Sequence, residues 1–348
     1  MSTKILIIGA NGQIGTELSR ALADKFGSIS VITSDLSPHG RLDDLHHEQL
    51  DATEASAITE IVERHKVTQI YLLAAALSAR GEQHPKWAWD LNMKSLLNVL
   101  EIARTHKLDK VFWPSSIAAF GPNTPRDLTP QDAVMDPTTI YGISKLAGEG
   151  WCDWYHRKHG VDVRSIRYPG LISWKTAPGG GTTDYAIEIF HAALKEGRYT
   201  SFLAQDTALP MMYMDDAIRA TLELMDAPAE KVKQRRSYNL AGVSFTPREI
   251  ATEISKHIPG FTLHCEPDFR QAIADSWPRS IDDSHAREDW GWKQQFNLEN
   301  LALAMLQNLR SNLSREGTPM QSVTGDRKNS EKNTVSLSAQ EQQQPHFA

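Results

Sequence analysis

Two side chains with the right types and spacing for acid–base chemistry, Tyr141 and Lys145, are four residues apart in the sequence. On a helix this spacing places both on one face, one turn apart. Asp136-Pro137 just upstream predicts the helix start, with the aspartate as N-cap and the proline in the first helical position. A nearby ammonium group lowers the pKa of a phenol, whose ordinary value is about 10. The pair is a candidate base with its activator; the alternative is a tyrosine and a lysine on a solvated helix face.

The elements that must position this pair begin near the N-terminus. The apolar run at residues 4–8 predicts a buried parallel strand, and a predicted helix follows it through Ala23. Between them lie three glycines at a spacing of three residues, Gly9, Gly12 and Gly15. A strand, a glycine-rich turn and a helix in this order indicate a dinucleotide-binding turn, in which backbone N–H groups at the helix start approach a pyrophosphate.

An acidic residue follows this turn at the distance expected for ribose recognition. A second predicted strand, at residues 29–33, leads to Asp35, which is 20 residues after Gly15. A carboxylate there can hold the adenosine ribose hydroxyls, and no arginine follows directly to accept a 2′-phosphate. We therefore expect NAD rather than NADP, with Asp51 near the adenine. The alternative for Asp35 is an ordinary loop residue.

The rest of the N-terminal half repeats the same alternation of strand and helix. Apolar runs predict strands at 69–74, 110–113 and 163–167, and amphipathic runs predict helices at 55–63 and 85–105. Such an alternation predicts an α/β fold with a doubly wound parallel sheet of the Rossmann type.

Ligands bind at the carboxyl ends of strands in such a sheet, and polar or small residues stand there. The strand at 69–74 runs into Ala74, Ala75 and then Ser78, and the strand at 110–113 is followed by Ser116. Ser78 and Ser116 are candidate hydrogen-bonding partners of a substrate, or turn serines. Bringing the pKa of Tyr141 to ~7 requires about 4 kcal/mol, at ~1.36 kcal/mol per pKa unit. A lysine together with an oxidised nicotinamide in a dry pocket can supply this.

A glycine-rich loop leads into a predicted helix at 185–196. Thr182 or Thr183 is expected to cap this helix, whose first N–H groups suit a carboxylate. Asp184 is a candidate partner for an ammonium group, or a residue that only stabilises the helix start. The glycines, Gly180 among them, suggest a loop that closes over a small substrate; the alternative is a flexible surface loop.

Composition excludes several classes of protein. The 348 residues are 40% hydrophobic and 23% charged, with a net charge of -6 and no block of basic residues. This argues against nucleic acid or a membrane as a partner. Cys152 and Cys265 form no disulfide framework, and the histidines, including His46 and His47, show no ligand spacing, so no metal is expected. The glycine turn begins at Gly9 and leaves no room for a presequence, which predicts a cytoplasmic location.

The chain is expected to divide into three parts. Residues 1–168 form mainly the NAD-binding domain, and residues 169–310 form mainly a substrate-binding lobe, with some chain returning to the first domain. The loop at Trp277 is expected to reach the pocket, and Thr246 to open a helix with a capping box. Residues 311–348 are rich in Ser, Gln, Asn, Glu and Lys, which predicts a disordered tail.

These motifs together resemble the extended short-chain dehydrogenase/reductase superfamily, of which UDP-galactose 4-epimerase is the best-known relative. The resemblance rests on the glycine turn, on Ser116 and on Tyr141-x-x-x-Lys145. More specifically, residues 168–185 (YPGLISWKTAPGGGTTDY) and residues 209–220 (LPMMYMDDAIRA) resemble the epimerase-type L-threonine 3-dehydrogenase family. The likeness covers roughly residues 4 to 310.

The resemblance implies oxidation of the 3-hydroxyl of L-threonine by NAD, without zinc, to give 2-amino-3-oxobutyrate. Tyr141 would accept the hydroxyl proton, Lys145 would hold the nicotinamide ribose and Ser116 would position the reacting oxygen. A homodimer through a helix bundle and coupling to a 2-amino-3-oxobutyrate CoA ligase are also implied. A nucleotide-sugar epimerase or dehydratase on the same scaffold is the alternative.

The expected cofactor contacts follow from the motifs and the resemblance together; they are Gly9, Asn11, Gly12, Gln13, Ile14, Gly15, Asp35, Asp51, Ala52, Leu73, Ala74, Ala75, Asn92, Tyr141, Lys145, Tyr168 and Leu171. The expected substrate contacts are Ser78, Ser116, Tyr141, Gly180, Thr182, Thr183 and Asp184.

Overall fold

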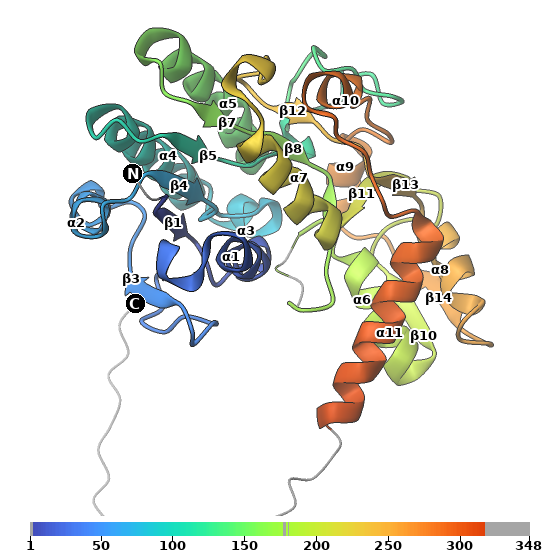
Figure 1. Cartoon of the computed structure of the whole chain (residues 1–348). Helices are drawn as coiled ribbons and strands as arrows, with labels where there is room; N and C mark the ends of the chain where they lie inside the picture. The colour runs from blue at the N-terminus through green and yellow to red at the C-terminus, as the bar shows by residue number, and fades with distance from the viewer. Residues whose placement is uncertain (1–2, 177–178, 180, 317–348) are drawn as a thin grey trace, which may run out of the picture.

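A computed structural model describes residues 3–176, 179 and 181–316 of the chain. A larger part, built mostly from the N-terminal half, lies beside a smaller part built mostly from the C-terminal half (Figure 1). No helix in these described ranges is long and apolar enough to cross a membrane.

The larger part is organised around a parallel sheet of six strands in the order β3-β2-β1-β4-β5-β7. Its strands are β1 (Ile5–Ile8), β2 (Val31–Asp35), β3 (His46–Gln49), β4 (Gln69–Leu72), β5 (Lys110–Phe112) and β7 (Val163–Arg164). The helices between them are α1 (Gln13–Phe26), α2 (Ala55–His65), α3 (Ser78–Gln83), α4 (Pro85–Thr105) and α5 (Ile140–His159). The predicted doubly wound α/β fold is confirmed.

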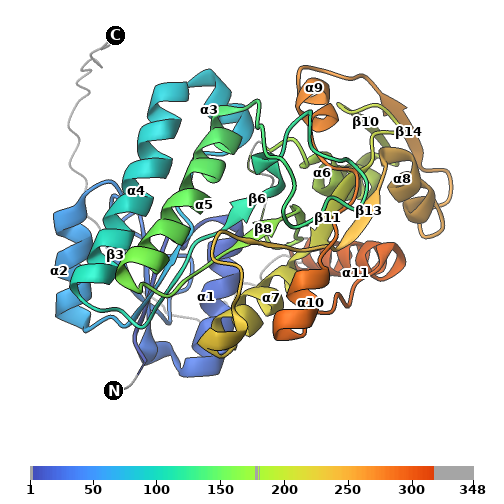
Figure 2. The same ribbon diagram turned by 90° about the horizontal axis from the view of Figure 1, so that it is seen from above.

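Strand β1 shows why this sheet is covered on both faces. All four of its residues are buried, and side chains alternate between the faces of a strand. Leu6 and Ile8 belong to the core formed with α2, α4 and α5. Ile5 and Ile7 belong to the core formed with α1 and with α7 (Met214–Asp226), a helix from the second half of the chain. Figure 2 shows α4 and α5 running along one another, with α1 and α7 on the other side of the sheet.

The described chain also forms three short sheets, ordered β13-β11-β9, β12-β8-β6 and β10-β14. Their strands are β6 (Ser115–Ser116), β8 (Ile166–Tyr168), β9 (Gly170–Ile172), β10 (Arg198–Ser201), β11 (Leu209–Tyr213), β12 (Tyr238–Asn239), β13 (Val243–Phe245) and β14 (Thr262–Cys265). Ile166 and Tyr238 pack in the same core as Ile5, so the sheet β12-β8-β6 belongs with the larger part. The remaining helices are α6 (Tyr185–Glu196), α8 (Pro247–Ser255), α9 (Arg270–Asp275), α10 (Ser284–Trp290) and α11 (Leu298–Glu316). The predicted capping box of α8 at Thr246 is present.

Several predicted boundaries are wrong for identifiable reasons. Helix α5 starts at Ile140, where Thr139 Oγ1 accepts a hydrogen bond from the N–H of Gly142 at 3.1 Å. Asp136, the predicted cap, instead accepts a hydrogen bond from the backbone N–H of Asn123 at 3.2 Å and so fixes the loop before the helix.

The other differences concern strand positions and the end of the last helix. Strand β2 begins two residues later than predicted because residues 28–30 form a turn of 3₁₀ helix, and the predicted strand at 163–167 is divided between β7 and β8. Strand β3 was not predicted at all. Helix α11 extends to Glu316, so residues 311–316 continue a helix rather than begin the predicted tail, and residues 317–348 lie outside the described ranges.

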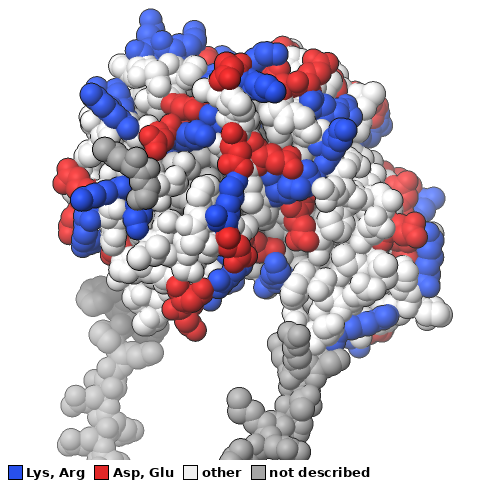
Figure 3. Space-filling model, in the orientation of Figure 1, with Lys and Arg blue, Asp and Glu red and all other residues white. Residues whose placement is uncertain are grey.

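Charged side chains are mixed in sign over the face of the molecule shown in Figure 3. Lys and Arg lie next to Asp and Glu over most of this face, in keeping with the net charge of -6. The described part of this face thus presents no extended area of one sign.

Candidate active site

The two acid–base residues lie in the first two turns of α5. Tyr141 is partly buried and Lys145 is 3% exposed. Lys145 Nζ donates a hydrogen bond to the backbone oxygen of Pro114 at 2.5 Å and lies 5.4 Å from the centre of the Tyr141 ring. It also lies 4.5 Å from the centre of the Trp113 ring. The predicted one-turn spacing is therefore present, and the lysine is held against the end of β5.

Burial moves both pKa values away from those that free side chains have. It raises the pKa of Tyr141 to about 12, although a hydrogen bond with Ser116 lowers it in part. Burial lowers the pKa of Lys145 to about 7, and the negative fields of Cys152 and Glu149 offset this in part. Burial therefore opposes the phenolate form of Tyr141 in the protein alone, and the lowering of its pKa by Lys145 together with an oxidised nicotinamide stays a prediction.

Ser116 is brought to Tyr141 by the strand ends, as the sequence predicted. It ends β6, and its Oγ accepts a hydrogen bond from the N–H of Ala118 at 3.2 Å. A side chain at position 142 is not tolerated, because a Cβ there would lie 2.0 Å from the backbone oxygen of Ala118. The absence of a side chain at Gly142 therefore lets the start of α5 pack closely against the turn after Ser116.

Beneath these residues lies a buried ion pair between α5 and β8. Arg167 donates to both carboxylate oxygens of Glu149, at 2.9 and 2.8 Å, and the two side chains are 2% and 0% exposed. Ser115 Oγ donates to the same carboxylate at 2.6 Å. This network joins the helix that carries Tyr141 to the strand that ends at Tyr168.

A small pocket surrounds the Tyr141 hydroxyl; we call it the Tyr141 pocket. Its volume is about 140 Å³, and it is lined by Gln13, Ile14, Leu77, Ser78, Ser115, Ser116, Ile117, Tyr141, Tyr168, Pro169, Gly170, Leu171, Gly181, Thr182, Thr183, Asp184 and Trp277. Residues from the glycine turn, from α5 and from the loop before α6 therefore meet in one place.

The loop before α6 contributes two buried polar residues to this pocket. Thr182 is 1% exposed, and its Oγ1 has no hydrogen-bond partner among the described residues. Asp184 is 9% exposed and its carboxylate accepts a hydrogen bond from the N–H of Gly181 at 2.7 Å. Asp184 itself is the N-cap residue of α6, so the predicted cap at Thr182 or Thr183 is wrong.

A second pocket, the Asp35 pocket, lies on the other side of the glycine turn. Its volume is about 260 Å³, and it is lined by Ile8, Gly9, Gly12, Asp35, Leu36, Leu50, Asp51, Ala52, Leu73, Ala74, Ala75, Arg80, Trp87 and Leu91. Gly12 lines this pocket and the next residue, Gln13, lines the Tyr141 pocket. An extended ligand that crosses the glycine turn would reach both.

The glycine turn is shaped for close approach of backbone to a ligand. Gly9 has a φ of +89°, and a Cβ there would lie 2.5 Å from the backbone nitrogen of Ala74. A Cβ at Gly15 would lie 2.3 Å from the backbone oxygen of Gly9. The first turn of α1 carries no acidic side chain and Gly12 offers no side-chain cap, so its N–H groups face an anion site. Asp35 is held beside this turn, where its Oδ2 accepts a hydrogen bond from the N–H of Asn11 at 3.1 Å.

The sequence profile of the NAD dependent epimerase/dehydratase family matches residues 5–241, a range that contains the glycine turn, Asp35, Ser116 and Tyr141. The chain belongs to this family. A curated relative, an uncharacterized epimerase/dehydratase of Staphylococcus haemolyticus (strain JCSC1435), is 48% identical over 307 residues, which cover 87% of this chain and 96% of the relative.

Two solved structures match most of the chain. The GalE-like L-threonine dehydrogenase from Cupriavidus necator (holo form) is 65% identical with a TM-score of 0.87, covering 88% of this chain and 99% of its own. The L-threonine dehydrogenase from Phytophthora infestans is 46% identical with a TM-score of 0.87, covering 89% of this chain and 100% of its own. This chain is thus an NAD-dependent enzyme of the epimerase/dehydratase family.

NAD, the cofactor of this family, fits the residues that are present. Gly9 and Gly15 let the turn pack tightly against Ala74 and against itself, while Gly12 has no closer neighbour than the oxygen of Gly9 at 3.4 Å and can be approached by a pyrophosphate at the start of α1. The Asp35 carboxylate suits ribose hydroxyls and would repel a 2′-phosphate, and no basic residue occupies the three positions after it. Asp35 and Asp51 would hold the adenosine, and the residues of the Tyr141 pocket would surround the nicotinamide.

Not every predicted cofactor contact lines a pocket. Asn92 is buried and accepts a hydrogen bond from the N–H of Ala76 at 2.7 Å and donates one to Ser144 Oγ at 3.0 Å, so it fixes the loop after β4. The backbone N–H of Asn11 is bonded to Asp35, and Lys145 lies behind Tyr141 rather than on the pocket wall. Gly180 lies outside the described residues.

The sequence interpretation missed six lining residues of the Asp35 pocket, which are Ile8, Leu36, Leu50, Arg80, Trp87 and Leu91. Arg80, in α3, lies 4.9 Å from the centre of the Trp87 ring, and both line the pocket. The position of Trp87 in the first turn of α4, next to the loop after β4, is the signal that could have identified it. Trp277 does reach the Tyr141 pocket, as expected.

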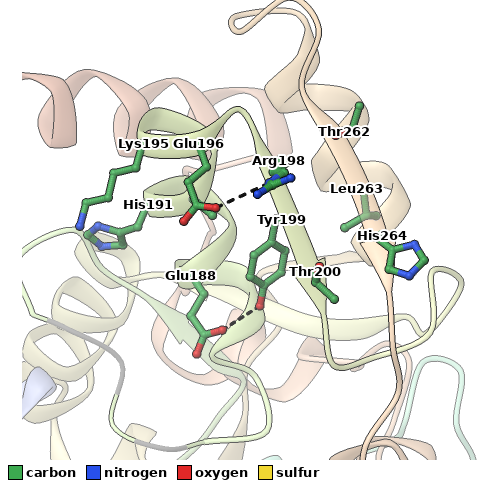
Figure 4. Close-up of a pocket in the computed structure, with 11 residues that line it drawn as sticks. Glu188, His191, Lys195, Glu196, Arg198, Tyr199, Thr200, Thr262, Leu263 and His264 are labelled. Atoms are coloured by element: carbon green, nitrogen blue, oxygen red, sulfur yellow. Dashed lines mark hydrogen bonds and ion pairs between the residues drawn. The ribbon is translucent and has the colours of Figure 1, made fainter.

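A more voluminous hollow lies elsewhere on the molecule. An open groove of about 1120 Å³ lies between α6, β10 and β14 (Figure 4). Two of its acidic side chains already have partners: Glu188 accepts a hydrogen bond from Tyr199 at 2.8 Å and Glu196 lies 3.8 Å from Arg198. The groove contains no residue of the glycine turn or of α5, so we assign the family's chemistry to the smaller Tyr141 pocket.

Proposed function

We propose that this chain is an NAD-dependent L-threonine 3-dehydrogenase. It oxidises the 3-hydroxyl of L-threonine to a ketone and reduces NAD to NADH, and the product is 2-amino-3-oxobutyrate. The observation that carries the proposal is the Tyr141 pocket, a small pocket of about 140 Å³ on which the candidate base and several hydroxyl-bearing side chains converge.

The volume of this pocket favours a small substrate. One water takes up ~30 Å³ of liquid, so the pocket has room for about five waters. Pockets for drug-sized ligands are larger, roughly 300–1,000 Å³. An amino acid fits this scale better than the two rings of a sugar nucleotide. The solved relatives described above as L-threonine dehydrogenases, at 46% and 65% identity, also support the choice of substrate.

The chemistry assigns one task to each residue around the hydroxyl. Tyr141, as phenolate, accepts the proton of the substrate 3-hydroxyl, and Ser116 donates a hydrogen bond to the same oxygen. The hydride leaves C3 with its electron pair, and NAD held at the glycine turn and Asp35 would supply its acceptor. Burial keeps the Tyr141 phenol protonated in the protein alone, so its ionisation depends on the positive charge of Lys145 and of the oxidised nicotinamide.

The other end of the pocket suits the amino acid group. The Asp184 carboxylate pairs with the substrate ammonium, and the buried Thr182 hydroxyl, which has no partner among the described residues, bonds to the carboxylate. Ser78 and Thr183 line the same wall. This arrangement selects for a ligand that carries an ammonium and a carboxylate on one carbon, as an α-amino acid does.

The test is a substrate panel with purified protein and NAD. We expect steady formation of NADH with L-threonine, and little or none with L-serine, L-allo-threonine or when NADP replaces NAD. Turnover of UDP-galactose or UDP-glucose without net NADH would instead identify an epimerase, because an epimerase returns the hydride to its substrate.

The remaining proposals concern the setting of the enzyme. We propose a homodimer, a cytoplasmic location, which the unpaired cysteines Cys152 and Cys265 suit, and functional coupling to a 2-amino-3-oxobutyrate CoA ligase. We also propose that residues 1–168 mainly bind NAD and residues 169–310 mainly bind the substrate. The product is an unstable β-keto acid, which either loses carbon dioxide to give aminoacetone or passes to this ligase, which cleaves it to glycine and acetyl-CoA.

A further inference from the structure

Three side chains at the outer edge of the parallel sheet have the composition of a transition-metal site. They are His46 and Glu48 from β3 and His65 from the end of α2, and their ligand atoms all lie within 4.8 Å of one another. Two imidazoles and one carboxylate are the ligands that Zn²⁺ takes in protein sites that keep an open coordination position. The cluster lies outside both pockets and is independent of the proposed function.

The fold itself brings these three residues together. His46 and Glu48 are two residues apart on a strand and so share a face, whereas His47 points to the other face and contacts Thr33 Oγ1 at 3.0 Å. In the register of the sheet His46 pairs with Ile32, which packs in the same core as α2. Figure 1 shows β3 and α2 at the same edge of the molecule.

The ligand atoms already converge. His46 Nε2 and His65 Nε2 lie 2.8 and 2.7 Å from the same oxygen, Glu48 Oε1. In a tetrahedral site with bonds of 2.0–2.2 Å, neighbouring ligand atoms are about 3.3–3.5 Å apart. Side-chain movements of less than about 1 Å would therefore admit an ion. The backbones stay in place because one belongs to a sheet and the other to a helix.

A neighbouring arginine holds the second oxygen of the carboxylate. Arg64 lies 3.1 Å from Glu48 Oε2, which fixes the orientation of the carboxylate but places a positive charge near the cluster. Arg64 is 48% exposed and has a second partner, Glu60, at 3.3 Å. It can therefore turn away from Glu48 toward Glu60 when a cation enters.

We propose that His46, Glu48 and His65 bind one divalent transition-metal ion of the zinc class, with water in the remaining coordination position. The sequence predicted no metal because His65 lies 17 residues from Glu48 and no short ligand motif joins them. Glu48 leads through Gln49 to Leu50, which lines the Asp35 pocket, so the ion binds on the strand that enters the adenosine end of the cofactor site.

The test is calorimetric titration of the full-length protein with ZnCl₂ in a buffer that does not bind metal. All variants carry Cys265→Ser, so that this partly exposed thiol does not bind zinc. We expect one zinc ion per chain, and His65→Ala should weaken its binding by at least ~10-fold, the scale seen when even a supporting residue of a metal site is lost. Arg64→Ala should tighten binding, because it removes the competing positive charge.

The matched control is His106→Ala. His106 forms a similar pair with Glu63 at 3.2 Å but is not part of a three-ligand group in the described residues, so its loss should leave the titration unchanged. Thermal unfolding of each variant checks that it is folded. Absence of zinc binding in the starting protein, or binding that survives His65→Ala unaltered, would overturn the proposal.

Discussion

Tyr141 can act as a base only when its phenol is ionised, and burial of the ring opposes this ionisation. Burial raises its pKa to about 12, so in the protein alone the phenol is protonated at neutral pH and the phenolate fraction grows with each unit of pH. The rate of oxidation should therefore rise with pH until the phenol is ionised in the complex. Tyr141→Phe should lower kcat by roughly 10²–10⁴-fold and remove this rise. The measurement is kcat/KM against pH.

A second tyrosine of α5 provides the control. Tyr155 is buried in the core shared with α4, donates a hydrogen bond to Glu101 at 3.2 Å and lines neither pocket. Tyr155→Phe should retain both the rate and the pH profile. If Tyr141→Phe stays within a few-fold of the unmodified enzyme, Tyr141 is not the base.

Asp35 offers a test of the cofactor end. Loss of a hydrogen bond to a charged group costs about 1.5–3 kcal/mol, so Asp35→Ala should weaken NAD binding roughly 10- to 100-fold. Binding is measured by fluorescence or calorimetric titration. Asp44→Ala, which removes an exposed carboxylate paired with Arg20, should have no effect. Unchanged NAD affinity in Asp35→Ala would remove this residue from the site.

At this scale the sequence predicted residue types better than it predicted environments. The glycine turn, Asp35, Ser116 and Tyr141 stand in short motifs with fixed spacing, so they were recognisable. The direction of the Tyr141 pKa shift depends on how much protein surrounds the ring, which spacing does not reveal.

Among the elements, those with strong periodicity were predicted well. The bounds of α4, α6 and β14 agree with the prediction because each has a regular apolar pattern and clear ends. Strand β3 has the sequence His-His-Glu-Gln and lies at the sheet edge, where no alternation of apolar residues is needed, so no pattern indicated it. The start of α5 was wrong because Asp136 and Thr139 are both plausible caps, and only the tertiary contact of Asp136 with Asn123 decides between them.

The ion pair between α5 and β8 is the contact whose loss should matter most at this scale. Removing one partner of a buried pair costs about 3–5 kcal/mol, because the other charge is left without compensation. Arg167→Met should therefore lower the free energy of unfolding by this amount, measured by urea denaturation. The double variant Arg167→Met/Glu149→Leu should recover part of the loss.

The exposed pair of Arg104 and Glu101, on α4, is the matched control. Surface pairs contribute at most about 1 kcal/mol, so Arg104→Met should change stability little. Equal losses in Arg167→Met and Arg104→Met would contradict the account of the buried pair.

On the scale of the whole molecule, an apolar face remains on α5. Ile143, Trp151 and Trp154 are 41%, 39% and 38% exposed, which is unusual for one helix of a monomer. This face supports the proposed homodimer. Trp154→Glu should convert the dimer to a monomer in light scattering coupled to size-exclusion chromatography.

Ile29 provides the comparison for this prediction. It is 85% exposed at the turn before β2, away from α5, so Ile29→Glu should leave the dimer intact. A protein that is already monomeric, or a Trp154→Glu variant that stays dimeric, would contradict the proposed interface.

The assembly of the Tyr141 pocket is the whole-molecule feature that the sequence did not give in full. The parallel sheet and the motif residues were predictable from local patterns. The size of the pocket depends on the glycine turn, α5, the loop before α6 and Trp277 meeting in space, and these are separated by up to most of the chain. Local sequence patterns do not reveal which of these distant segments meet in the folded chain or how much space they leave between them.

The central claim is that hydride passes from C3 of L-threonine to NAD in this pocket. The most direct test is to supply L-threonine deuterated at C3 together with NAD and to examine the reduced cofactor by mass spectrometry. The account predicts one deuterium in each NADH formed and none when the label is at C2. Unlabelled NADH, or no NADH from L-threonine at all, would contradict it.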